Sequence, residues 1–174
     1  DLGTREFEVE GYTEFRLAGD RLMTLTEVEG SEEGDHLLSS WPVDGGGATV
    51  LGAFRVGLFS ETRVPGWAVD PTGAWLGRAD DRDVHLHRLD TLHDVGTVSP
   101  RFTLQHPERI MALTLGTDGD PVVTADDSDT IRIWSPRRQS APLRTLQGQQ
   151  GVKTVSVDPQ RSTLAVAGGR SVRL

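Results

Sequence analysis

The sequence contains no cysteine and no asparagine. The first absence excludes disulfide bonds and cysteine-based metal sites, and the second excludes N-linked glycosylation. No apolar run approaches the length of a membrane span, and the first residues show no signal-peptide pattern. We therefore expect a cytoplasmic protein that has no membrane partner.

Basic residues are in the minority, and lysine is nearly missing. There are 26 acidic against 18 basic residues, which gives a net charge of −8. Because a negative surface does not attract nucleic-acid phosphates or anionic lipids, we expect neither as the main partner. The single lysine, Lys153, and the abundance of arginine, glycine, aspartate and alanine are typical of bacterial genomes of high GC content. The chain starts at Asp1 and stops inside an alternating apolar run, so we expect a fragment of a larger bacterial protein.

One apolar frame occurs four times along the chain. An apolar residue is followed by a second one three positions later and by a third one two positions after that. The third residues are Leu17, Val69, Leu115 and Val157, so the gaps are 52, 46 and 42 residues, and residues 28–35 are extra in the first unit. A period in the low forties is typical of a repeat architecture.

Within each unit, short alternating runs are separated by turn signals. In the clearest unit we expect strands at 101–104, 110–115, 121–125 and 130–134. The sequence therefore predicts an all-β fold with antiparallel sheets and units at residues 1–47, 48–90, 98–136 and 141–174, the last one truncated at its end. The acidic segment 27–35 is predicted to be a solvated insertion in the degenerate first unit, because its carboxylates repel one another.

The third unit carries residues that resemble a known family. Its last strand ends in Trp134-Ser135, an Asp-rich turn precedes that strand, and Leu104 and His106 stand ahead of the inner strand. This pattern resembles a WD-repeat (WD40-like) β-propeller. The resemblance implies four-stranded antiparallel blades, about four of them, in a partial propeller whose remaining blades belong to a longer chain. The alternative is a four-bladed ring, in which residues 5–9 would supply the outer strand that the last unit lacks.

The resemblance also implies a buried hydrogen-bonded network inside the third blade. Its residues here would be His106, Thr124, Asp127 and Trp134. Such a network is structural, because a buried histidine needs a polar partner and a tryptophan donates one hydrogen bond. A catalytic role for His106 is disfavoured, since a catalytic triad needs a nucleophile beside the histidine.

Three other segments could be read as metal or phosphate sites, but each is better explained as an ordinary strand or loop. His85 and His87 share one face of a strand, but a metal site would need a third ligand such as Asp83 or His93. The glycine run 45–47 lacks the ending of a phosphate-binding loop, and 126–129 lacks the frame of a calcium loop. We therefore expect no catalytic residues, no metal and no cofactor.

The function expected is that of a non-catalytic scaffold that binds a protein or peptide, as a module of a larger signalling or regulatory protein. The alternative is a propeller-fold enzyme or a small-ligand-binding domain that uses the central funnel, and a third possibility is a wholly structural solenoid. Loops that precede inner strands fall on one face of the disc. They place Arg63, Arg109 and Gln149 as candidate partner-binding residues, and the arginines favour an acidic peptide.

Overall fold

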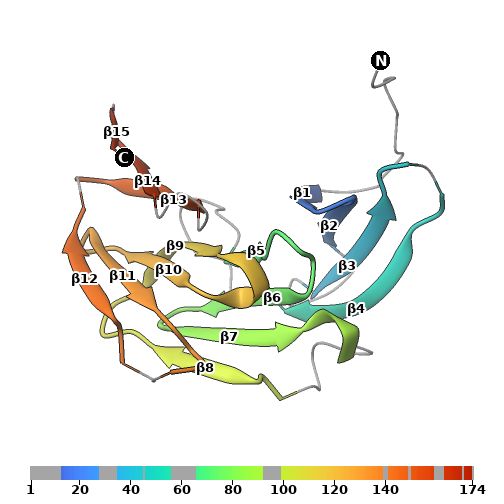
Figure 1. Cartoon of the computed structure of the whole chain (residues 1–174), viewed down its shortest axis with the longest axis horizontal. Coiled ribbons are helices and arrows are strands. Elements are labelled where there is room, and N and C mark those ends of the chain that lie inside the picture. Colours follow the sequence, from blue (N-terminus) through green and yellow to red (C-terminus); the bar gives the residue numbers. More distant parts are fainter. Residues whose placement is uncertain are drawn as a thin grey trace.

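The computed structural model describes residues 13–27, 35–44, 46–55, 66–91, 99–138, 141–148, 150–158, 163–169 and 171–173. These residues form four antiparallel sheets that follow one another around an arc, with the first and fourth sheets at its two ends (Figure 1). The prediction of an all-β fold with propeller blades is confirmed. No helix in the described ranges is long and apolar enough to cross a bilayer.

Each sheet is a meander, in which strands adjacent in sequence are also adjacent in space. The first sheet contains β1 (Thr13–Ala18), β2 (Arg21–Glu27), β3 (Asp35–Pro42) and β4 (Thr49–Arg55). The second contains β5 (Trp67–Val69), β6 (Trp75–Asp80), β7 (Asp83–Arg88) and β8 (Phe102–Gln105), with the 3-10 turn η1 (Leu89–Thr91) between the last two.

The third sheet contains β9 (Ile110–Leu115), β10 (Val122–Asp126), β11 (Thr130–Trp134) and β12 (Arg144–Gln147), with η2 (Thr117–Gly119) between the first two. The fourth contains β13 (Val152–Asp158), β14 (Thr163–Gly168) and β15 (Ser171–Arg173). Two-residue turns join β1 to β2 and β6 to β7, and a three-residue turn joins β10 to β11. The turn signals in the sequence locate these strands well.

The sheets are offset by one strand from the units read in the sequence. β4 falls in the unit 48–90 but pairs with β3 of the first sheet, and β8 falls in the unit 98–136 but pairs with β7 of the second. The outermost strand of a sheet is thus followed directly by the innermost strand of the next. The units 48–90, 98–136 and 141–174 therefore each contribute strands to two blades, and this holds neighbouring blades together.

The described residues form three buried clusters, one between each pair of adjacent sheets. Met23 and Leu38 of the first sheet pack with Trp67 and Leu76 of the second. The second and third sheets share a cluster that includes Leu86, Leu104, Ile110 and Leu115, and the third and fourth share one that includes Ala125, Ile131, Val155 and Val166. Burial of these apolar faces against each other is what stabilises the stack of sheets.

The repeated apolar frame lies on the innermost strands. Its members on β5, β9 and β13 are buried (Trp67, Ile110, Leu115, Val152, Val155) or partly buried against the clusters (Val69, Leu113, Val157). Its members on β1, Phe15 and Leu17, are exposed. Two expectations fall outside the described residues. These are the possible closing strand at 5–9 and the acidic insertion, apart from its ends at Glu27 and Asp35, which belong to β2 and β3.

Candidate functional site

A buried hydrogen-bonded network lies inside the third sheet, and Thr124 is its centre. The indole Nε1 of Trp134 donates to Thr124 Oγ1 at 2.9 Å, and His106 Nε2 lies 2.8 Å from the same oxygen. The rings of His106 and Trp134 are also in contact, with centroids 4.9 Å apart. Three of the four residues named from the sequence are thus brought together.

The carboxylate of this network is Asp126 and not the Asp127 named from the sequence. Asp126 is the last residue of β10 and is buried, and its Oδ2 pairs with Arg132, whose Nη1 lies 3.3 Å from His106 Nδ1. Asp126 Oδ1 accepts from the backbone N–H of Ser128 at 3.1 Å and of Thr130 at 3.0 Å, as in a tight turn. Asp127 is one residue further on, where the turn faces solvent, so its side chain is exposed.

The environment of this network keeps its histidine neutral. Burial, and next to it the positive charge of Arg132, lower the pKa of His106 to about 4. Burial alone would raise the pKa of Asp126, but hydrogen bonds from Ser128 and Arg132 outweigh it and the pKa is lowered. His106 is therefore a neutral structural group at pH 7, engaged within its blade.

Acid is expected to destabilise the fold through its buried histidines. Burial, together with Arg78, also lowers the pKa of His87 to about 4, from the ordinary value of 6.5. In the unfolded chain His87 and His106 become protonated near pH 6.5, whereas in the folded chain they stay neutral until about pH 4. The stability that the two neutral histidines contribute is therefore complete above pH 6.5 and is lost as the pH falls toward 4. Thermal unfolding midpoints measured from pH 7 to pH 4 should fall, and less steeply in His106→Gln. An unchanged slope in that variant would contradict the assignment.

The same position in the other blades gives an internal comparison. Trp134 faces Val122 across the sheet, as Trp41 faces Leu22 in the first sheet and His87 faces Leu76 in the second. Trp41 Nε1 donates to Thr24 Oγ1 at 3.0 Å, so the first sheet keeps the tryptophan–threonine pair of the third. The sequence reading missed Thr24, because the acidic insertion lengthens the spacing between the two residues.

The proposed partner-binding residues are only partly described. Arg63 and Gln149 lie outside the described residues. The side chain of Arg109 is 37% exposed and lies 3.8 Å from the carboxylate of Asp127, which is a surface ion pair of small energetic weight. This loop contacts the turn at the start of β7, since the backbone N–H of His106 donates to Arg82 O at 2.8 Å.

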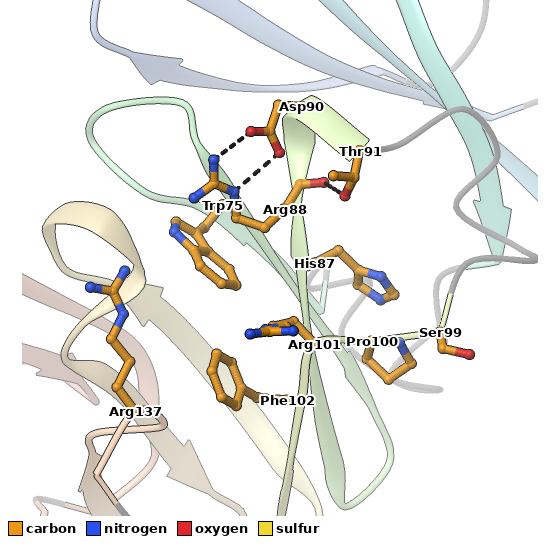
Figure 2. Close-up of a pocket in the computed structure, with 10 residues that line it drawn as sticks. All are labelled: Trp75, His87, Arg88, Asp90, Thr91, Ser99, Pro100, Arg101, Phe102 and Arg137. Carbon is orange, nitrogen blue, oxygen red and sulfur yellow. Dashed lines mark hydrogen bonds and ion pairs between the residues drawn. The ribbon is translucent and has the colours of Figure 1, made fainter.

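A cavity of about 760 Å³ lies at the other end of the second sheet, where β7 ends, and we refer to it as the basic pocket. Figure 2 shows its lining, which comes from the end of β7 and η1, the start of β8, the start of β6 and the segment after β11: Trp75, His87, Arg88, Asp90, Thr91, Ser99, Pro100, Arg101, Phe102 and Arg137. Four separate segments of the chain build it, so no local sequence motif could have pointed to it.

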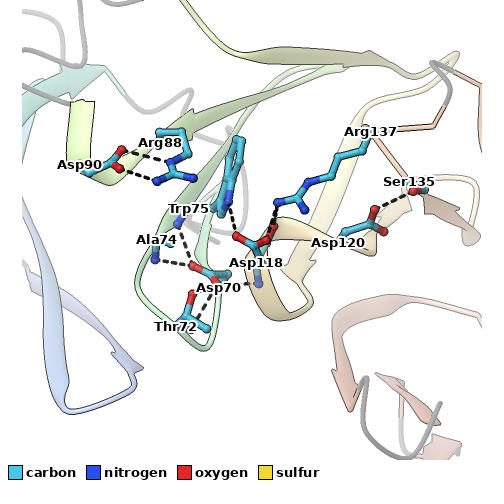
Figure 3. Close-up of polar contacts among 10 residues, drawn as sticks. All are labelled: Asp70, Thr72, Ala74, Trp75, Arg88, Asp90, Asp118, Asp120, Ser135 and Arg137. Carbon is cyan, nitrogen blue, oxygen red and sulfur yellow. Dashed lines mark hydrogen bonds and ion pairs between the residues drawn. The ribbon is translucent and has the colours of Figure 1, made fainter.

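Trp75 forms the floor of the basic pocket. Its ring centroid is 5.9 Å from that of Phe102, and the guanidinium carbons of Arg88 and Arg137 lie 5.5 Å and 5.8 Å from the indole centroid. Its Nε1 donates to Asp118 Oδ1 at 3.1 Å, across the boundary between the second and third sheets. Figure 3 shows how these contacts tie the two blades together at this end.

Asp70 fixes the turn that carries Trp75. Its buried carboxylate accepts from the backbone N–H of Ala74 at 2.7 Å, of Trp75 at 2.7 Å and of Asp118 at 2.9 Å. The last of these contacts comes from the third sheet (Figure 3). The floor of the basic pocket is therefore rigidly placed by one carboxylate.

Two of the three arginines that line the basic pocket are paired. Arg88 donates two hydrogen bonds to Asp90, one of them at 3.1 Å. Hydrogen bonding by Arg88 lowers the pKa of Asp90. Arg137 donates to Asp118 Oδ2 at 2.7 Å. Arg101 has no carboxylate partner in the part of the chain that the structure describes, and its guanidinium carbon lies 6.0 Å from the centroid of Phe102.

The histidine pair considered as a metal site does not gather further ligands. His85 Nδ1 lies 3.3 Å from Thr103 Oγ1, and His87 is buried behind it. Among the described residues, no group of three or more His, Asp or Glu side chains could hold a metal ion. His93, the other ligand considered, is outside those residues.

Comparisons with known proteins agree with this architecture. Residues 98–135 match the family model described as WD domain, G-beta repeat. WD repeat-containing protein 55 is 28% identical over 88 residues in Rattus norvegicus and 27% identical in Bos taurus, and these 88 residues are 51% of this chain and 22% of each relative.

A solved chain from the crystal structure of the mitotic checkpoint complex has the same fold. It superposes with a TM-score of 0.59 at 20% identity over 94% of this chain. The chain spans 48% of that solved chain, and its match spans under a quarter of the WD repeat-containing relatives. Residues 98–135 therefore match a WD40 repeat, and the described residues have the fold of a β-propeller with four blades.

Proposed function

We propose that this chain is a non-catalytic protein-interaction scaffold. The observation that carries the proposal is the WD40 repeat at 98–135 together with the network inside it. The side chains there that could perform chemistry are His106 and Asp126 above all. His106 bonds to Thr124 and Arg132, and Asp126 pairs with Arg132, so these contacts hold the blade together. A rigid disc that presents loops at both ends is suited to docking other proteins.

The finer assignment is a module of a larger bacterial signalling or regulatory protein that supplies further blades. The preference for arginine over lysine supports a bacterial source. The 48% coverage of the solved chain supports a longer propeller. The alternative of a propeller enzyme, or of a small ligand in the central funnel, would require side chains that converge on the funnel to do chemistry.

The loops before the inner strands are one proposed docking face, with Arg63, Arg109 and Gln149. Arg109 supports this proposal, because its side chain is partly exposed and its pairing with Asp127 is a weak surface contact. Arginine is enriched at binding hot spots, and it would favour an acidic segment of the partner.

Affinity purification with the tagged full chain tests this function. We expect specific protein partners to be recovered, and we expect Arg63→Glu with Arg109→Glu to reduce their recovery. Arg144→Glu is the matched control, since Arg144 is exposed on the outer strand β12. Recovery of partners equal to that on beads without the chain would contradict the scaffold function. Recovery unaffected by the double variant would exclude only this docking face.

A further inference from the structure

The basic pocket gathers three arginines around aromatic side chains at one end of the second sheet. We propose that it binds a peptide segment that carries a carboxylate side chain next to an apolar one. This inference rests on the proposed interaction function, but it places a second docking site at the end of the blades opposite to Arg109.

The charge of the lining is opposite to that of the whole chain. Three arginines and one aspartate line the cavity, whereas the chain has a net charge of −8. Asp90 pairs with Arg88, and Asp118, just outside the lining, pairs with Arg137. The guanidinium of Arg101 is the lining cation that no described carboxylate pairs with, and its planar fork matches a carboxylate.

His87 is a second polar group in the lining, and its two ring nitrogens are buried in this structure. Its side chain lines the cavity and is 2% exposed, and neither ring nitrogen has a hydrogen-bond partner among the described residues. In the first and third sheets the same position holds a tryptophan bonded to a threonine. A buried polar group without a partner is costly, and a ligand that reaches it removes that cost. A neutral imidazole can donate one hydrogen bond to a carboxylate or carbonyl oxygen.

The apolar part of the lining fits the second half of the proposed ligand. Phe102 and Pro100 are partly exposed at the start of β8, and the Arg101 side chain extends to the same side as Phe102 (Figure 2). Behind them, Trp75 is held by Asp118 and by Asp70. An apolar side chain of the ligand would pack on Phe102 while its neighbour pairs with Arg101. Such a floor needs little reordering on binding, which favours affinity.

A peptide fits this site better than a nucleic acid does. Both carry negative charge, but a phosphate backbone extends well beyond the cavity and meets the acidic surface of the rest of the chain. A short acidic segment meets only the local positive charge. Binding should therefore weaken with salt, as expected for a charge-assisted contact at a partly exposed site.

Selection of displayed peptides on the full 174-residue chain tests the inference. The probe is a random seven-residue library, and the strongest binder is then measured by fluorescence polarisation. We expect the recovered sequences to be enriched in aspartate or glutamate beside an apolar residue. Arg101→Glu should weaken the binder about tenfold or more, while Arg144→Glu changes it less than about twofold.

A version of the binder with its acidic residues replaced by amides completes a double-mutant cycle with Arg101→Glu. It should bind about tenfold more weakly to the natural chain and show little further loss on Arg101→Glu. Arg101 is exposed, so this variant should keep the circular dichroism spectrum of the parent.

Three results would overturn the inference. One is that no peptide is recovered above the level of chain-free beads, and another is that the recovered peptides lack acidic residues. The third is that they bind Arg101→Glu as tightly as the parent. None of these results bears on the affinity purification, which decides separately whether the chain is an interaction scaffold.

Discussion

Replacement of Asp70 by alanine is expected to lower the free energy of unfolding by about 3–5 kcal/mol. The carboxylate is fully buried at 0% exposure and accepts hydrogen bonds from three backbone N–H groups within 3.0 Å, those of Ala74, Trp75 and Asp118. Thr72 adds its own N–H at 3.2 Å and its hydroxyl. Alanine would leave these donors unpaired between two blades, and each buried orphan donor costs about 1–3 kcal/mol. Urea unfolding followed by circular dichroism measures the loss.

Asp120→Ala is the matched control for this prediction. Asp120 lies in the equivalent turn of the third sheet, but it accepts one side-chain bond, from Ser135 Oγ at 2.6 Å. It is expected to lose only about 0.5–1.5 kcal/mol. Equal losses in the two variants would show that Asp70 does not act as the link between the second and third blades.

Replacement of Trp134 by alanine is the second large effect we expect, at about 3–5 kcal/mol. Its ring is 1% exposed in the cluster between the second and third sheets, so alanine leaves a cavity there. Trp134→Phe keeps most of the packing but removes the donor to Thr124, and it should cost about 1–3 kcal/mol. Thermal and urea unfolding of both variants separate packing from hydrogen bonding.

Trp41→Phe is the control, because it removes the same kind of bond to Thr24 at a half-buried ring. We expect a smaller loss there than in Trp134→Phe, since the ring of Trp41 is only half-buried and water can enter next to Thr24 once the indole is gone. If Trp134→Phe were as stable as the parent and lost a protein partner instead, Trp134 would be a binding residue and its structural role would be wrong.

Local patterns were enough to predict many of the strands. Strands 110–115 and 130–134 coincide with β9 and β11, because alternation and turn residues act over a few neighbouring positions. Three members of the network, His106, Thr124 and Trp134, were predicted from the resemblance of the third unit to a WD repeat. Its carboxylate was assigned one position too late, because the choice between Asp126 and Asp127 depends on where β10 ends. That end is set by pairing with β9, which shifts register after Ala125.

The sequence by itself determined the repeat, the all-β class and most of the residues that fill the interior, since burial selects apolar side chains at a fixed phase in the second, third and fourth units. In the first unit, Phe15 and Leu17 have the same phase but are exposed. Only the tertiary structure decided which sheet takes each outer strand, because the repeated apolar frame does not mark whether β4 and β8 pair with the strand before them or with the strands after them. The tertiary structure also decided the basic pocket. Trp75, Arg101 and Arg137 are far apart along the chain and meet because two blades pack side by side. A surface built from several segments has no period and no local motif, so sequence reasoning has nothing to detect there.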